Sequence, residues 1–242
     1  MKIFVFSDVH GDKYSLEALD GNSDFVNADM RIFLGDFVTF GPHSEEVVQW
    51  FKSRNDVMCL IGNNDSYVVN GLTDEEREEK SKQKLDHVAI VRNELSDSSV
   101  EYLQSLPKEY EMNIDGKSVL FCHFNWESDT EVCIESATPE DKTTTVESFK
   151  GRDYDYIVYG HVHTPSTLYD GNKVLYGVGS FGVLYPGRYT MIDTTNGFSV
   201  IRKKMSYDKD SFIRDLSNVH DEARQYFYGF IDEELASADM YD

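Results

Sequence analysis

The sequence predicts an α/β protein in which helices cover the faces of a β-sheet. Three short hydrophobic runs in the first 65 residues each end in a polar cluster, and helix-like segments separate them. Strands that alternate with helices pair in parallel through right-handed crossovers, which places the helices over the sheet. A chain of 242 residues with 40% hydrophobic residues has the length and composition of one large globular domain.

The alternation of strands and helices is clearest in the amino-terminal third of the chain. Each strand-like run is rich in β-branched or aromatic residues and stops at glycine or a polar residue. These runs are Lys2–Ser7, Arg31–Leu34 and Val57–Ile61. Helical patterns follow the first two runs, at Tyr14–Leu19 and at Glu45–Lys52, and Ser44 is placed to cap the second helix.

The rest of the chain combines a helical segment with further strands. Residues 73–106 have the pattern of a pair of helices, the second beginning near Ser96, which we expect beside the sheet or over its mouth. Asp115-Gly116 predicts a tight hairpin between strands at 109–114 and 117–122. After a polar stretch, a strand at 156–159 and the later turns predict a β-meander.

These patterns predict one domain with one extension. We expect the domain to span residues 1–205, with a helical insertion at about 73–106. Residues 206–242 contain ten acidic and three basic residues, a net charge of −7, with apolar positions such as Phe212 and Leu216. We therefore expect an acidic helical extension that packs on the same domain.

Charge and cysteine usage exclude several partners and compartments. With 23 Lys plus Arg against 44 Asp plus Glu, the formal charge of −21 would repel a nucleic-acid backbone. The three cysteines, Cys59, Cys122 and Cys133, form no CxxC pair and suit a reducing compartment. The opening run is too short for a signal peptide or a membrane helix. We expect a cytoplasmic protein with no membrane partner, and its oligomeric state stays open.

Polar residues that can bind metals follow the predicted strands. They are Asp8, His10, Asp36, Asn63, His123, His161 and His163. Open α/β sheets assemble their sites at the carboxyl ends of the strands, so these side chains could converge. Such oxygen and nitrogen donors suit Mn, Fe or Zn, and seven are too many for one ion. The pattern therefore predicts a two-metal site, with cations about 3.5–4 Å apart, of the kind that acts on phosphoryl groups.

The order of these residues resembles the calcineurin-like metallophosphoesterase superfamily. Its motifs DxH, GD, GN, a lone His and GHxH match the chain in series. The matching residues are Asp8-Val9-His10, Gly35-Asp36, Gly62-Asn63, His123 and Gly160-His161-Val162-His163. Short length and the stretches after Gly35 and Gly179 resemble the small bacterial branch, which contains phosphodiesterases and diadenosine polyphosphate hydrolases. The resemblance implies a four-layer α-β-β-α sandwich, with two packed mixed sheets and helices outside.

The resemblance also implies which metal ion each site residue would bind. Asp8, His10 and His163 would hold one metal, and Asn63, His123 and His161 the other. Asp36 would bridge the two ions and count among the catalytic residues. The expected cofactors are two transition-metal ions, Mn, Fe or Zn, with Mn expected to support activity. The implied reaction is in-line attack on phosphorus by a metal-bridging hydroxide.

One residue departs from the family pattern and bears on the substrate. Many members have a His after the motif Asn, thought to protonate the leaving group, whereas this chain has Asn64, whose amide cannot release a proton near pH 7. Good leaving groups are then favoured, so we expect phosphoanhydrides or phosphodiesters, including diadenosine tetraphosphate-type nucleotides. Asn64 could donate a hydrogen bond to substrate, and His43 is a second candidate for substrate binding and a possible substitute proton donor.

Two other functions remain open on the same fold. A Ser/Thr protein phosphatase would use the same metals on alkyl monoesters, without the usual His. A non-catalytic binding scaffold would be expected to lose some of the ligands, and all of them are present here. Asp12 and Asp65 flank ligand residues and would either orient them or cap helices.

Overall fold

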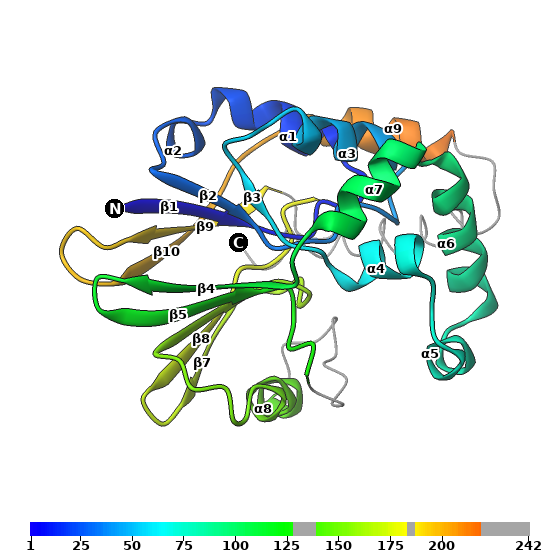
Figure 1. The fold of residues 1–242 in the computed structure, drawn as a ribbon. Helices are drawn as coiled ribbons and strands as arrows, with labels where there is room; N and C mark the ends of the chain where they lie inside the picture. Colours follow the sequence, from blue (N-terminus) through cyan, green and yellow to red (C-terminus); the bar gives the residue numbers. More distant parts are fainter. Residues whose placement is uncertain (128–138, 183–186, 219–242) are drawn as a thin grey trace.

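Two five-stranded mixed sheets stack face to face, and helices cover their outer faces (Figure 1). The computed structural model describes residues 1–127, 139–182 and 187–218. The strand order is β10-β9-β1-β2-β3 in the first sheet and β4-β5-β6-β8-β7 in the second. This arrangement confirms the expected α-β-β-α sandwich.

The described elements have the following bounds. The strands are β1 (Lys2–Phe6), β2 (Met30–Phe33), β3 (Met58–Cys59), β4 (Glu109–Ile114), β5 (Lys117–Cys122), β6 (Tyr156–Tyr159), β7 (Ser166–Asp170), β8 (Lys173–Gly177), β9 (Arg188–Asp193) and β10 (Ser199–Lys204). The helices are α1 (Lys13–Glu17), the 3₁₀ helix η1 (Ala18–Gly21), α2 (Ser23–Val26), α3 (Ser44–Lys52), α4 (Asn63–Asn70), α5 (Asp74–Glu79), α6 (Lys82–Glu94), α7 (Asp97–Ser105), α8 (Pro139–Ser148) and α9 (Lys209–Ser217).

Strand β1 lies at the centre of the first sheet and is buried on both faces. It pairs in parallel with β2 and antiparallel with β9. Ile3 and Val5 belong to the apolar cluster between the two sheets, whereas Phe4 and Phe6 pack among the helices on the other face. Burial on both faces explains why this strand is a continuous apolar run rather than an alternating one.

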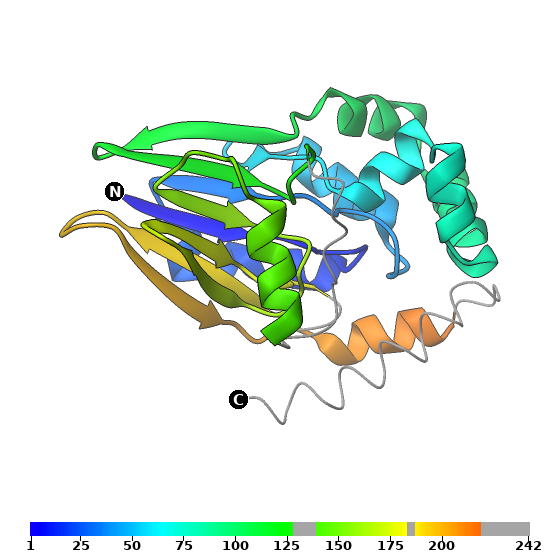
Figure 2. The same cartoon turned by 90° about the horizontal axis from the view of Figure 1, so that it is seen from below.

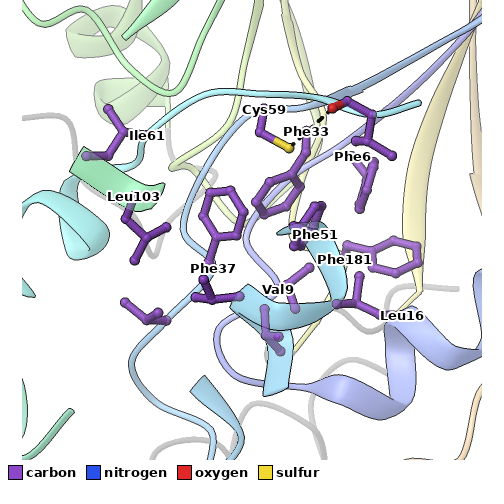
Figure 3. Close-up of a cluster of buried hydrophobic side chains, with 14 of the residues drawn as sticks. Phe6, Val9, Leu16, Phe33, Phe37, Phe51, Cys59, Ile61, Leu103 and Phe181 are labelled. Carbon is purple, nitrogen blue, oxygen red and sulfur yellow. Dashed lines mark hydrogen bonds between the residues drawn. The ribbon is translucent and has the colours of Figure 1, made fainter. Parts of the chain in front are cut away.

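Aromatic side chains fill the space between the first sheet and its helices. Phe33 stacks on Phe51 of α3 at a centroid distance of 4.4 Å, and Phe37 meets Phe51 edge to face at 4.6 Å (Figure 3). On the other side of the molecule, Phe149 after α8 joins the cluster on the outer face of the second sheet. These two clusters and the one between the sheets hold the layers together.

The helical segment after β3 differs from the expected pair of helices. Three helices, α5, α6 and α7, occupy residues 74–105, because the backbone turns extended at Lys80 and Ser81 caps α6. Ser96 caps α7, as expected. Together with α4, these helices lie beyond one end of the strands, opposite the hairpin loops (Figure 2).

Two helix boundaries differ from those that the sequence predicts. The first helical stretch splits into α1 and η1, and Asp12 is its cap, accepting from the amides of Tyr14 and Ser15. Ser44 does not cap α3: the helix begins at Ser44 with His43 at the cap position. The Ser44 hydroxyl instead accepts a hydrogen bond from the amide of Thr39, so it secures the preceding loop.

The carboxyl-terminal extension begins with α9, which packs against α1. Phe212 and Leu216 are buried in this contact layer, as the apolar pattern indicated. Residues 219–242, and Cys133, lie outside the described residues, so the domain boundary at residue 205 stays a prediction. Within the described part of the chain, the helices include none with the length and apolar character to cross a membrane.

Candidate metal centre

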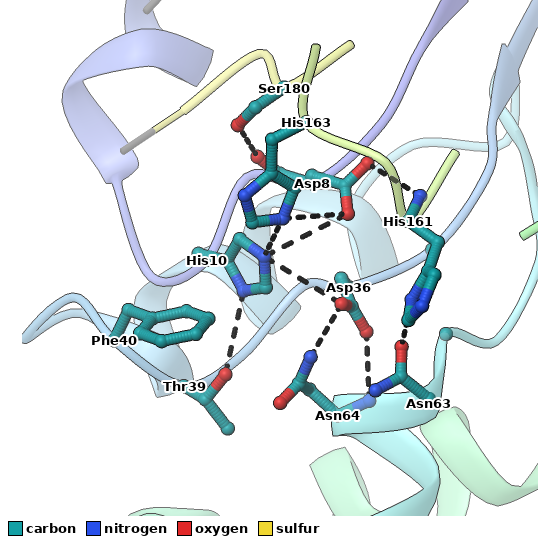
Figure 4. Close-up of polar contacts among 12 residues, drawn as sticks. Asp8, His10, Asp36, Thr39, Phe40, Asn63, Asn64, His161, His163 and Ser180 are labelled. Carbon is teal, nitrogen blue, oxygen red and sulfur yellow. Dashed lines mark hydrogen bonds and ion pairs between the residues drawn. The ribbon is translucent and has the colours of Figure 1, made fainter. Parts of the chain in front are cut away.

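The metal-binding candidates lie where strands of both sheets end. Asp8 and His10 follow β1, while Asp36 and Asn63 follow the parallel strands β2 and β3. His123 follows β5, and the loop after the parallel strand β6 carries His161 and His163. The structure brings all seven side chains into one cluster, with His161 partly exposed and the others buried. Figure 4 labels six of them: Asp8, His10, Asp36, Asn63, His161 and His163.

The first group in this cluster is Asp8, His10 and His163. The Nε2 atoms of His10 and His163 are 3.2 Å apart. The nearer oxygen of Asp8 lies 3.4 Å from His163 Nε2 and 3.8 Å from His10 Nε2. These three side chains offer atoms close enough together to hold one ion.

The second group contains Asn63, His123 and His161. The amide oxygen of Asn63 is 3.0 Å from His123 Nε2 and 2.9 Å from His161 Nδ1. His123 also forms a compact set with the carboxylates of Asp8 and Asp36 that could hold an ion.

Asp36 lies between the two groups. Its Oδ2 atom is 3.6 Å from His10 Nε2 in the first group and 3.3 Å from His123 Nε2 in the second. One carboxylate in contact with both groups has the position needed to bridge two cations.

Backbone carbonyls set the orientation of two imidazoles. Nδ1 of His10 lies 3.1 Å from the Val38 carbonyl, and Nδ1 of His123 lies 3.0 Å from the Leu34 carbonyl. A carbonyl can only accept, so each Nδ1 carries a proton, and the Nε2 atom of each ring is directed at the cluster.

The backbone around the site is strained. Asp8, His10, Asp36 and His161 have φ values of 59°, 52°, 62° and 63°, in the left-handed region that non-glycine residues rarely adopt. Each such residue costs on the order of 1–3 kcal/mol and persists only where its surroundings enforce it. Strain on four candidate ligands is therefore a structural sign of a functional site.

The carboxylate of Asp65 enforces the conformation of the loop after β2. It accepts hydrogen bonds from the amides of Asp36 and Phe37 at 2.8 Å, from Val38 at 3.2 Å and from Gly62 at 2.9 Å. Asp65 therefore acts both as part of the α4 cap and as the residue that holds the Asp36 loop, whereas Asp12 caps α1 and also accepts a hydrogen bond from the side chain of Tyr207.

At two motif positions, neighbouring atoms approach the backbone so closely that only glycine fits. A Cβ atom on Gly62 would lie 2.2 Å from Asp36 Oδ1 and 2.4 Å from its amide nitrogen. A Cβ on Gly160 would lie 2.1 Å from the Ser7 hydroxyl. Both glycines therefore let neighbouring loops approach the carboxylates of the cluster.

Burial and neighbouring charges shift the pKa values of several residues in the cluster. Burial alone would raise the pKa of Asp36, but His123, His10 and the Asn64 side chain outweigh it and lower this pKa below its usual range. Burial opposes protonation of His123, yet Asp36 and Asp8 raise its pKa to about 9. Burial lowers the pKa of His10 to about 4, so this ring is neutral at pH 7, as a metal ligand must be.

The donor set fits transition-metal ions. Asp8 Oδ1 is buried and has no hydrogen-bond partner within the described residues. A carboxylate oxygen in that position is costly to bury unless a cation or donor satisfies it. Imidazole, carboxylate and amide donors together suit Mn, Fe or Zn, so the residues present fit the expected cofactors.

The structure places Lys84 beside the site, which the sequence did not indicate; Asn64 connects this lysine to Asp36. The Asn64 side-chain nitrogen donates to Asp36 Oδ2 at 2.6 Å, and its backbone amide donates to Asp36 Oδ1 at 2.9 Å. The Asn64 oxygen accepts a hydrogen bond from Lys84 of α6. Nothing in the sequence around Lys84 marks it, because the contact depends on how α6 packs over the site.

His43 points toward other helices. Its Nε2 atom is 3.1 Å from Asp215 Oδ2 of α9, and its ring meets Tyr14 of α1 edge to face at 5.4 Å. These contacts lend no support to substrate binding by His43, which stays a prediction.

Two aromatic rings lie beside the second donor group. The ring centroids of Phe124 and Trp126 are 4.3 Å apart, and the Phe124 centroid lies 5.3 Å from that of His161.

The fold and this site define a class of protein. Residues 1–203 match the family model of the calcineurin-like phosphoesterase superfamily domain, and the chain belongs to that superfamily. The family is metal-dependent, and the Asp and His groups described above could bind two metal ions.

The chain is similar to proteins from archaea and bacteria. An uncharacterized protein of Methanocaldococcus jannaschii is 34% identical over 134 residues, which cover 51% of this chain and 49% of that protein. The match thus spans about half the length of that curated relative. A metallophosphoesterase from Sphaerobacter thermophilus has a TM-score of 0.65 at 20% identity, covering 94% of this chain and 98% of its own.

Two further solved structures share the fold. A hypothetical protein from Pyrococcus horikoshii has a TM-score of 0.70 at 14% identity, covering 94% of this chain and 97% of its own. A candidate diadenosine tetraphosphatase has a TM-score of 0.55 at 20% identity, covering 85% of this chain and 94% of its own. At these identities, the structural likenesses show the fold alone.

Gly62→Ala should destabilise the protein, because the added methyl group would overlap Asp36. We expect a loss of about 1–3 kcal/mol in the free energy of unfolding, or a fall of several degrees in Tm. Gly21→Ala is the matched control, since nothing lies within 4 Å of its added Cβ. Equal Tm values for the two variants would contradict the close approach.

Saturation with Mn²⁺ should load about two ions per chain, because two groups of donors share the cluster. Elemental analysis of protein purified without chelator and then equilibrated with Mn²⁺ measures the ratio. A ratio of one or less would contradict the two-metal interpretation.

Asp36→Asn should reduce hydrolysis by at least about 10²–10³-fold, because charge compensation is lost beside both groups. Initial rates with Mn²⁺ and thermal unfolding are measured together, so that loss of fold is separated from loss of chemistry. Asp56→Asn, at an exposed carboxylate paired with Arg31, is the control. Near-normal turnover of Asp36→Asn would rule out a bridging role.

Proposed function

We propose that this protein is a dinuclear metal-dependent phosphoesterase that hydrolyses phosphoanhydride or phosphodiester bonds. The observation that carries the proposal is the position of Asp36 between two groups of buried imidazole, carboxylate and amide donors. Two bound transition-metal ions would neutralise charge on a phosphoryl group and lower the pKa of a water molecule that attacks phosphorus.

The protein's own residues would prepare this chemistry. Asp8, His10 and His163 are proposed to hold one ion, and Asn63, His123 and His161 the other, with Asp36 shared. The carbonyls of Val38 and Leu34 keep the Nε2 atoms of His10 and His123 directed at the cluster. Because hydrogen bonds to the backbone set this orientation, little reorganisation is needed during the reaction.

The proposed substrate class follows from Asn64. Its amide cannot donate a proton to a departing oxygen near pH 7, and one of its N–H groups is already used by Asp36. Substrates whose leaving group is stable without protonation are therefore favoured, which includes phosphoanhydrides and aryl diesters. Diadenosine tetraphosphate-type nucleotides fit this description. The likeness to a candidate diadenosine tetraphosphatase extends only to the fold.

A substrate panel with Mn²⁺ tests the proposal. It compares bis(p-nitrophenyl) phosphate, p-nitrophenyl phosphate, diadenosine tetraphosphate, ATP and a phosphopeptide. We expect the diester and the anhydrides to be hydrolysed and the phosphopeptide, an alkyl monoester, to be hydrolysed poorly, because no acid at Asn64 protonates its leaving group.

Other rankings would favour the two alternatives. Preference for the phosphopeptide would indicate a protein phosphatase. No hydrolysis of any substrate by folded, metal-loaded protein would indicate a binding scaffold. The Asp36→Asn variant serves as the matched inactive control for every substrate.

A further inference from the structure

Helix α6 brings two polar side chains to the loop that follows Asp36. His87 is fully buried, and its Nε2 atom accepts a hydrogen bond from the amide of Phe40 at 2.9 Å. Lys84, one turn earlier on the same face, has its ammonium 4.9 Å from the centroid of the Phe40 ring. The contact through His87 therefore fixes where α6 presents Lys84.

The Lys84 ammonium is connected to the metal cluster through one amide group. It donates to the oxygen of Asn64, and the nitrogen of the same amide donates to Asp36 Oδ2. Figure 4 shows this nitrogen directed at Asp36 and the oxygen on the far side of the side chain. The Lys84 ammonium thus lies just outside the metal-binding cluster at which the reacting phosphoryl group would bind.

Lys84 stays mostly charged at pH 7, although its surroundings lower its pKa. Burial lowers the pKa of Lys84 to about 8, while the Asp36 carboxylate opposes this change and Lys80 adds to it. Most of the side chain's population is therefore protonated at pH 7. The influence of Lys80 also shows that a second cation lies nearby, which is notable in a protein with a formal charge of −21.

We propose that Lys84 binds a second phosphate of the substrate, the one linked to the reacting phosphoryl group. This inference rests on the proposed function and narrows it to substrates with a phosphoanhydride bond. One amide group separates Lys84 from Asp36, a spacing that the neighbouring phosphate of a polyphosphate chain can reach. An ammonium gives a strong, charge-assisted hydrogen bond to such a group.

The reaction then balances without a proton from the enzyme. The oxygen of a water molecule forms the new bond to phosphorus and loses a proton to solvent. The bond from phosphorus to the bridging oxygen breaks, and the electron pair stays on that oxygen as the second phosphate leaves. Lys84 neutralises this added negative charge, which compensates for the absence of an acid at Asn64.

Lys84→Gln should lower kcat/KM for diadenosine tetraphosphate by about ten- to hundredfold, since one hydrogen bond to a charged group is lost. The loss on bis(p-nitrophenyl) phosphate should be clearly smaller, because that substrate has no second phosphate. Lys84→Arg keeps the charge and should retain more anhydride hydrolysis than Lys84→Gln. Lys82→Gln is the matched control: Lys82 lies on the same helix, is exposed and pairs with Asp86.

A binding measurement tests the same inference without turnover. Imidodiphosphate, in which nitrogen replaces the bridging oxygen of pyrophosphate, and orthophosphate are titrated into Mn²⁺-loaded protein by calorimetry. Lys84→Gln should weaken imidodiphosphate binding by about ten- to hundredfold and orthophosphate binding far less. Thermal unfolding confirms that each variant folds.

The outcomes separate this inference from the proposed function. Equal losses on both substrates and both ligands, or no loss, would overturn the role of Lys84 and leave a phosphoesterase in place. A wild-type protein inactive on the whole panel would contradict the proposed function. In that case the difference between imidodiphosphate and orthophosphate binding would still decide whether Lys84 recognises a second phosphate.

Discussion

The buried carboxylate of Asp36 is the interaction on which the site depends. It touches an imidazole from each donor group, and it accepts two hydrogen bonds from Asn64 at the first turn of α4. Its loop is held in turn by Asp65, and Gly62 leaves room for it. Burial of this anion is tolerated because His10, His123 and Asn64 offset the repulsion from the nearby carboxylates. Three strands and one helix thus converge on a single charged group.

Much of the fold and the site could be predicted from local patterns. The apolar runs became β1, β2 and β3, and the polar residues at their ends lie in one cluster. Strand direction alone brings such residues to one edge, so no long-range information was needed. Ser96 begins a helix as the sequence predicts, whereas the helix start at Ser81 is not predicted, so the first expected helix is divided into two.

Contacts that depend on packing between distant elements could not be predicted. Lys84 reaches Asn64 only because α6 folds back over the Phe40 loop, and no spacing in the sequence records that approach. The left-handed backbone at Asp8 and Asp36 is equally hidden, since propensity would favour glycine or asparagine at such positions. Strained backbone at candidate ligands and a lysine packed against the Asn64 amide are places where local preference is overruled by the requirements of a site.

The pairing of β1 with β9 has a consequence for synthesis of the protein. Ile3 pairs with Ile192, and the amide of Phe181 donates to the carbonyl of Ser7. Strand β1 therefore has one neighbour that is synthesised only after β2 to β8. The Asp8 loop likewise lacks His163 until the segment after β6 has been synthesised. A metal site that needs donors from both segments therefore cannot form around β1 and its loop alone.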